Sequence, residues 1–128
     1  MKEKIKPTES EMAVLQILWQ RGPSSVREVN DEFNKEREVG YTTTLKIMQI
    51  MAEKNYVSRD TESRTHIYTS KLKETEVRKD LIDRMVDGAF RGSAMQLVMQ
   101  ALGNHKTSKE ELEDLKTLIE KIEKEQSK

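Results

Sequence analysis

The stretch from residue 41 to residue 55 most constrains the fold, because its two sides differ in character at the spacing of an α-helix. One side is suited to packing and carries Thr44, Ile47, Met48 and Met51. The other side offers short hydrogen-bonding groups, an amide and a cation, on Thr42, Thr43, Lys46 and Gln49. Asn55 stands where such a helix would stop. The pattern predicts a helix with one face for a core and one face for a ligand.

The segment that follows this helix predicts a β-hairpin. Residues 56–60 and 65–69 have the composition of strands, and the polar residues 61–64 between them are typical of a turn. Arg59 and Arg64 place two cations on this hairpin. A helix followed at once by a basic hairpin is typical of a winged helix-turn-helix domain.

Two further helices are expected ahead of residue 41. Thr8 with Glu11, and Ser25 with Glu28, have the spacing of capping boxes, which mark helix N-termini. Trp19 lies on the apolar side of the first of these helices, so we expect it to pack in the core. The first 70 residues are therefore predicted to run helix, helix, helix, strand, strand.

The C-terminal part of the chain shows helical periodicity and no strand pattern. Three helices with no sheet to pack on carry more apolar positions than one chain can bury, so we expect them to meet the same helices of a second chain. The residues predicted for this homodimer contact are Leu81, Met85, Phe90, Leu97, Val98, Leu112, Leu115, Leu118 and Ile119. The predicted fold is mainly α with a small β-hairpin wing. Residues 1–72 would form a winged-helix DNA-binding domain and residues 73–128 a helical dimerisation region.

The charge of the chain is balanced overall but not locally. The 23 basic and 23 acidic side chains cancel, so the strongly basic composition common in DNA-binding proteins is absent. Residues 41–73 nevertheless hold six basic side chains against three acidic ones. The local excess lies where a DNA-reading surface would need it.

Several classes of function are excluded by what the sequence lacks. The chain has no cysteine, and its two histidines lie far apart with no carboxylate at metal-ligand spacing. The sequence shows no catalytic combination of nucleophile, base and orienting group, and its glycines form no phosphate-binding loop. We therefore expect no enzyme activity, no metal, no cofactor and no small-molecule substrate. With no apolar run of membrane-spanning length and no secretory signal, we expect the chain in the cytoplasm.

The residues around the predicted reading helix can be assigned roles in binding double-stranded DNA. Lys46, Arg59 and Arg64 would attract phosphates or contact a guanine. Thr42 and Thr43 would hold the helix end on the DNA backbone, and Gln49 would read an adenine edge. The alternative hypothesis is a winged-helix module that binds protein, which the neutral overall charge also allows.

The chain resembles the penicillinase-repressor family of winged-helix regulators, which includes the β-lactamase and methicillin-resistance repressors. The resemblance spans nearly the whole chain and rests on short motifs in a fixed order: residues 8–19, Tyr41-Thr42-Thr43, Tyr68 and Asp87-Gly88-Ala89-Phe90. It implies a homodimeric repressor in which the third helix of each subunit enters the major groove of a palindromic operator, the wing touches the DNA backbone, and the C-terminal helices intertwine.

The resemblance also implies a way of ending repression. In antibiotic-responsive members, a membrane-bound sensor metallopeptidase leads to cleavage of an Asn-Phe bond in the dimer arm. The matching position here is Gln100-Ala101, a different dipeptide. Release by a ligand that shifts the dimer equilibrium is the alternative. Copper-responsive members carry paired cysteines near the C-terminus, and since this chain has none, a copper switch is not expected.

Overall fold

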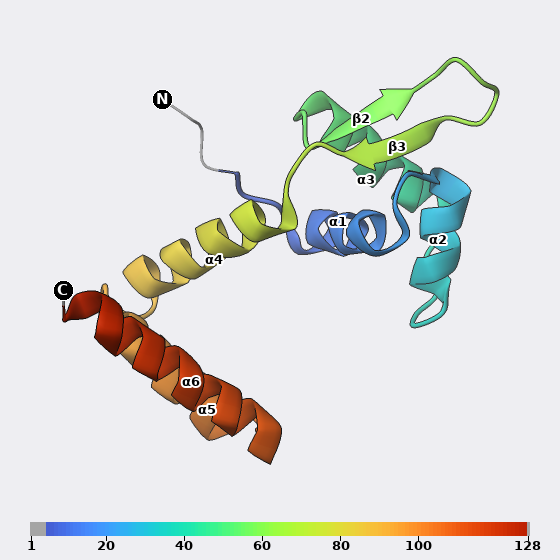
Figure 1. Ribbon diagram of the computed structural model, residues 1–128. Coiled ribbons are helices and arrows are strands. Elements are labelled where there is room, and N and C mark those ends of the chain that lie inside the picture. The colour runs from blue at the N-terminus through green and yellow to red at the C-terminus, as the bar shows by residue number, and fades with distance from the viewer. Residues whose placement is uncertain (1–4, 128) are drawn as a thin grey trace. The chain divides into compact units, whose positions relative to one another are not determined.

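The computed structural model describes residues 5–127 (Figure 1). Its helices are α1 (Glu9–Arg21), α2 (Val26–Asn34), α3 (Tyr41–Glu53), α4 (Glu74–Gly88), α5 (Ala94–Asn104) and α6 (Lys109–Gln126). Its strands are β1 (Ser24–Ser25), β2 (Val57–Asp60) and β3 (Ile67–Ser70). The predicted order of three helices and a hairpin is found in residues 9–70.

Capping groups set where the first helices begin and where α3 ends. Both predicted boxes are formed: the hydroxyls of Thr8 and Ser25 accept from the N–H groups of Glu11 and Glu28 at 3.1 and 3.2 Å. Asn55 has a φ of 63°, the left-handed conformation that ends many helices. The predicted stop of α3 at Asn55 is therefore confirmed.

Glu11 joins the start of α1 to the end of α3. One carboxylate oxygen accepts from the Thr8 N–H at 2.9 Å, and the other accepts from the Lys54 ammonium at 2.7 Å. The Glu11 side chain is only 5% exposed, and both bonds offset the free-energy cost of burying its carboxylate. The hydrogen bond to Glu11 raises the pKa of Lys54.

The sheet has one strand that the sequence pattern does not predict. β1 is two serines long and pairs antiparallel with β3, with Ser24 opposite Tyr68 and Ser25 opposite Ile67. The strand order is therefore β1-β3-β2, and the hairpin β2–β3 is one side of a three-stranded sheet. Two serines after a proline carry no alternation and no β-branched residue, so only the pairing with β3 makes them a strand.

The core lies between the first three helices and the sheet. Its buried apolar members are Val14, Leu15, Leu18, Val26, Val29, Met48, Met51, Val57 and Tyr68. Trp19 packs against this cluster while half-buried, and its indole N–H donates to the Ser70 hydroxyl at 3.1 Å and to the Leu72 carbonyl at 3.0 Å. The indole thus attaches the segment after β3 to α1.

The chain forms two compact units, residues 1–82 and 83–128. The first includes Val77 of α4, which is 1% exposed, and so extends beyond the core elements. Among the described residues of the second unit, none is buried. The assignment of DNA binding to residues 1–72 and of dimerisation to residues 73–128 stays a prediction.

Replacing Glu11 with Gln should destabilise the protein by about 1 to 2 kcal/mol, because the amide nitrogen cannot accept from Lys54 and is left buried. Urea unfolding at one fixed protein concentration measures the loss. Glu113→Gln is the matched control, since its pair with Lys116 is exposed on both sides and should contribute less than about 0.5 kcal/mol. Equal shifts for the two variants would contradict a structural role for the Glu11 contact.

Candidate nucleic-acid interface

Asn34 fixes the turn between α2 and α3. Its amide nitrogen donates to the carbonyls of Asn30 and Val39 at 2.7 and 2.9 Å, and its amide oxygen accepts from the Val39 N–H at 3.0 Å. One side chain therefore holds the end of α2 to the residue just before Gly40, the N-cap of α3. The direction in which α3 leaves the turn is set by these bonds.

The inner side of α3 is fixed by one buried hydrogen bond and by packing. The Thr44 hydroxyl is fully buried and donates to the Asn30 amide oxygen of α2 at 2.6 Å. Met48 and Met51 continue the same side into the core. The predicted packing face is thus buried at Thr44, Met48 and Met51, whereas Ile47 is half-buried.

The outer side of α3 presents a row of exposed polar residues. Thr42, Lys46 and Gln49 are exposed and follow one another at helical spacing, so they share one face. Glu53, one of the three acidic residues counted in residues 41–73, continues this row as an exposed carboxylate. Thr43 is exposed but lines a neighbouring cleft beside Phe33 and the α2–α3 turn. The structure brings three of the four predicted α3 residues onto one face.

The threonines at the start of α3 do not cap the helix. Gly40 is the N-cap, and no side chain caps this helix. Thr42 and Thr43 lie past the N-cap, and their hydroxyls are not used in capping α3. Their predicted contact with a DNA backbone stays a prediction.

The wing consists of β2, β3 and the turn between them, and it carries the other two predicted cations. Arg59 stands opposite Tyr68, so it lies on the sheet face that also contributes to the core. Arg64 lies in the turn, and both arginines are exposed. They come from different places in the wing, and no described contact joins them to each other.

The cations discussed for this unit fall into two groups, those that form ion pairs and those that form none. Arg21 pairs with Glu28 and Glu32, and Lys35 pairs with Glu32. The backbone hydrogen bond from Ser25 lowers the pKa of Glu28, and the hydrogen bond from Lys35 lowers the pKa of Glu32, so these carboxylates stay ionised. Across residues 5–127, by contrast, Lys46, Arg59 and Arg64 enter no ion pair. Positive charge is left unneutralised on the side of α3 and the wing.

Arg27 is a further cation beside α3 that was not predicted from the sequence. Its guanidinium carbon lies 5.8 Å from the centre of the Tyr41 ring, at the start of α3. Tyr41 itself is 45% exposed. The Ser25–Glu28 capping box could have signalled this residue, because it places Arg27 in the first turn of α2.

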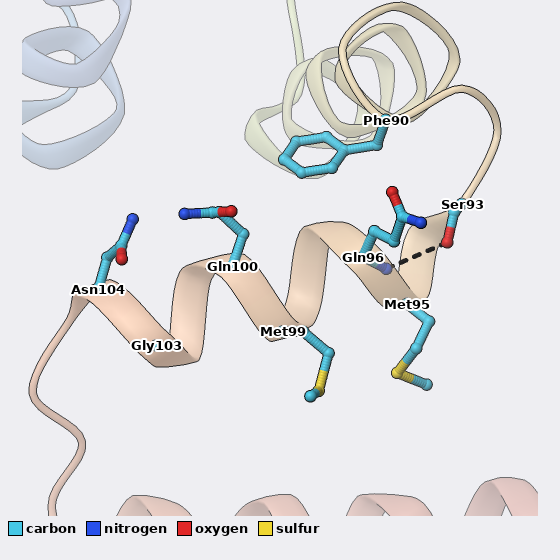
Figure 2. Close-up of a pocket in the computed structure, with 8 residues that line it drawn as sticks. All are labelled: Phe90, Ser93, Met95, Gln96, Met99, Gln100, Gly103 and Asn104. Atoms are coloured by element: carbon cyan, nitrogen blue, oxygen red, sulfur yellow. Dashed lines mark hydrogen bonds between the residues drawn. The ribbon is translucent and has the colours of Figure 1, made fainter.

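The residues predicted for dimerisation are not buried in the single chain. Met85, Val98, Leu112, Leu118 and Ile119 are exposed, and Leu81, Phe90, Leu97 and Leu115 are half-buried. A groove of about 450 Å³ runs along α5; Figure 2 shows Phe90 over the side that carries Gln96 and Gln100, with Met95 and Met99 on the other side. The predicted cleavage position, Gln100-Ala101, is exposed within α5.

Residues 5–127 contain no group of three His, Asp or Glu side chains placed to hold a metal ion. None of the helices described combines the length with the apolar character needed to cross a membrane.

Comparison with known proteins identifies related sequences along most of the chain. The family model described as penicillinase repressor matches residues 7–121. The penicillinase repressor of Staphylococcus aureus is 23% identical over 115 residues, which make up 90% of this chain and 91% of that protein. The match runs through both units.

Solved structures share the fold. The monomeric form of BlaI from Bacillus licheniformis, solved in complex with the blaP half-operator, is 21% identical with a TM-score of 0.50, and the match covers 59% of this chain and 93% of that chain. A transcriptional regulator from Thermotoga maritima is 20% identical with a TM-score of 0.52, over 94% of this chain and 80% of that chain. The predicted fold class, winged helix followed by C-terminal helices, is confirmed.

Proposed function

The chain belongs to the penicillinase repressor family of transcriptional regulators, and we propose that it is a homodimeric repressor that occludes a palindromic operator through α3 and the wing. DNA binding and repression are the activities of this family. The proposal adds three points for this chain, which are the homodimer, the residues that contact DNA and the way in which the repressor is released. One observation carries it: α3 and the wing expose three cations, Lys46, Arg59 and Arg64, that have no acidic partner among the described residues.

Each residue of the interface has a chemical role in the proposal. Lys46, Arg59 and Arg64 supply the attraction to phosphates that every DNA-binding protein needs, and an arginine or lysine can also pair with a guanine edge. Gln49 has the amide that matches adenine. Thr42 and Thr43 donate short hydrogen bonds to the DNA backbone near the start of α3.

Dimerisation is supported by the lack of a core in residues 83–127. Helices whose apolar side chains are at most half-buried within their own chain gain little from packing, so another surface would stabilise them. The exposed apolar side chains there include Met85, Val98, Leu112, Leu118 and Ile119. A second copy of the same helices offers matching apolar surface and aligns two α3 helices with the two halves of a palindrome.

Release from DNA by cleavage at Gln100-Ala101 follows from the family resemblance, through a membrane-bound sensor metallopeptidase pathway. The bond lies inside α5, and proteases need an extended substrate, so α5 has to open locally before cutting. Cleavage would separate α6 from the DNA-binding unit and remove the gain from tethering two half-sites. A ligand that shifts the dimer equilibrium is the alternative route.

Lys46→Ala and Gln49→Ala should weaken binding in different ways. Lys46→Ala should weaken binding to every duplex. It should also lower the magnitude of the salt slope, the slope of the logarithm of the binding constant against the logarithm of the salt concentration, by about 1 per subunit, because each phosphate contact releases counterions. Gln49→Ala should instead reduce discrimination by about 1 to 3 kcal/mol at one base pair. Fluorescence anisotropy with a duplex selected from a random pool, and with sonicated bulk duplex, measures both.

If Gln49→Ala loses the same affinity for both duplexes, Gln49 contacts the DNA backbone or packs within the protein and does not read a base. Wild-type protein whose duplex binding is absent, or insensitive to salt, would favour the protein-interaction module over a DNA reader.

Leu118→Glu should convert a dimer to a monomer, because it places a charge on the apolar side of α6. Thr117→Glu is the control, since it introduces the same charge on the exposed opposite side of the same helix. Sedimentation equilibrium at micromolar concentration distinguishes the two. A monomeric wild-type chain under those conditions would rule out the proposed dimer.

Cleavage should yield a fragment that ends at Gln100 when the regulated genes are expressed. Mass spectrometry of the intact protein from induced and uninduced cells detects it. Full-length protein that persists during expression would leave ligand-driven release as the surviving route.

A further inference from the structure

A cleft of about 290 Å³ opens between the first turn of α2, the start of α3 and the part of the wing where the turn leads into β3. Arg27, Tyr41, Arg64 and His66 are among its lining residues. The pairing of Ser25 with Ile67 in the sheet brings the start of α2 beside the start of β3. The unpredicted strand β1 therefore builds this cleft, by joining two segments about 40 residues apart in sequence.

The cleft is positively charged, which favours the binding of an anion. Its lining includes two arginines and no carboxylate. Within residues 5–127, neither Arg27 nor Arg64 enters an ion pair. Asp31 follows Arg27 by one helical turn, yet the arginine lies over the Tyr41 ring instead.

The contact of Arg27 with the Tyr41 ring leaves the arginine able to bind a ligand. At 5.8 Å from the ring centre the contact is a cation–π attraction and not a hydrogen bond to an oxygen or nitrogen atom, so it leaves the N–H donors of the guanidinium available to an anion. Those donors match a phosphate bidentately, which the ammonium of a lysine cannot do. Tyr41 thus acts as a positioning residue that keeps the guanidinium oriented at low entropic cost.

The position of the cleft indicates which phosphate it takes. Tyr41 directly precedes Thr42, the first residue of the exposed row on α3, and Arg64 belongs to the wing. Building on the proposed DNA-binding function, we propose that this cleft holds a backbone phosphate of the bound duplex between Arg27 and Arg64, with Tyr41 orienting Arg27. The contact is independent of base sequence and sets how α3 is seated in the groove.

The test measures binding of full-length protein to sonicated bulk duplex DNA across a salt series. Arg27→Gln should lower the magnitude of the salt slope by about 1 per subunit, and it should weaken binding to all sequences by the same factor. Arg27→Lys should keep the slope of the wild type while losing part of the affinity. Arg78→Gln is the matched control, an exposed helical arginine of the same unit paired with Glu74, and should bind as the wild type does.

The role of Tyr41 is tested by a double-mutant cycle. Tyr41→Leu should weaken binding without changing the salt slope, and Tyr41→Phe should restore binding because the ring face is kept. Tyr41→Leu combined with Arg27→Gln should be no weaker than Arg27→Gln alone, since the ring acts through the arginine. Circular dichroism and thermal unfolding check that each variant is folded.

The possible outcomes distinguish failure of the cleft proposal from failure of the proposed DNA-binding function. Wild-type protein without salt-dependent duplex binding would overturn the proposed function itself. Salt-dependent wild-type binding together with an unchanged slope and affinity for folded Arg27→Gln would overturn the cleft alone. Additive losses in the cycle would remove Tyr41 as the residue that positions Arg27.

Discussion

Everything that the DNA-binding unit presents depends on the burial of one side of α3. The Thr44 hydroxyl is fully buried there, and its hydrogen bond to Asn30 avoids the cost of an unsatisfied buried donor. Because the spacing of an α-helix is fixed, holding Thr44 against α2 forces Lys46 and Gln49 outward. A polar contact inside the protein therefore determines which groups are available to a ligand outside it.

The elements that sequence could predict are those whose signals are local. The Ser25–Glu28 box and the Asn55 stop act over a few residues, so their chemistry can be recognised without a structure. The exposure of Lys46 and Gln49 follows in the same way from the helical period of their neighbours. The fold class was predictable because its helices and hairpin each carry such a signal.

The elements that sequence could not predict depend on residues brought together from a distance. β1 is a strand only because β3 pairs with it, and Ser24-Ser25 alone would suggest a cap or a turn. The Ser25–Glu28 box places Arg27 in the first turn of α2, but its contact with the Tyr41 ring joins two helices and cannot be predicted from its own neighbours. The extent of the first unit, which includes the buried Val77, likewise depends on tertiary packing rather than on the periodicity of α4.

The absence of buried residues among those described in the second unit has a consequence for the population of molecules in a cell. In the proposed dimer, ordering of these helices and pairing of two chains form a single equilibrium, and its position depends on how many chains are present. The assembled form then varies with the square of the number of free chains. When synthesis stops and growth dilutes the pool, operator occupancy falls more steeply than the protein count, so the genes under control switch on over a narrow range of dilution.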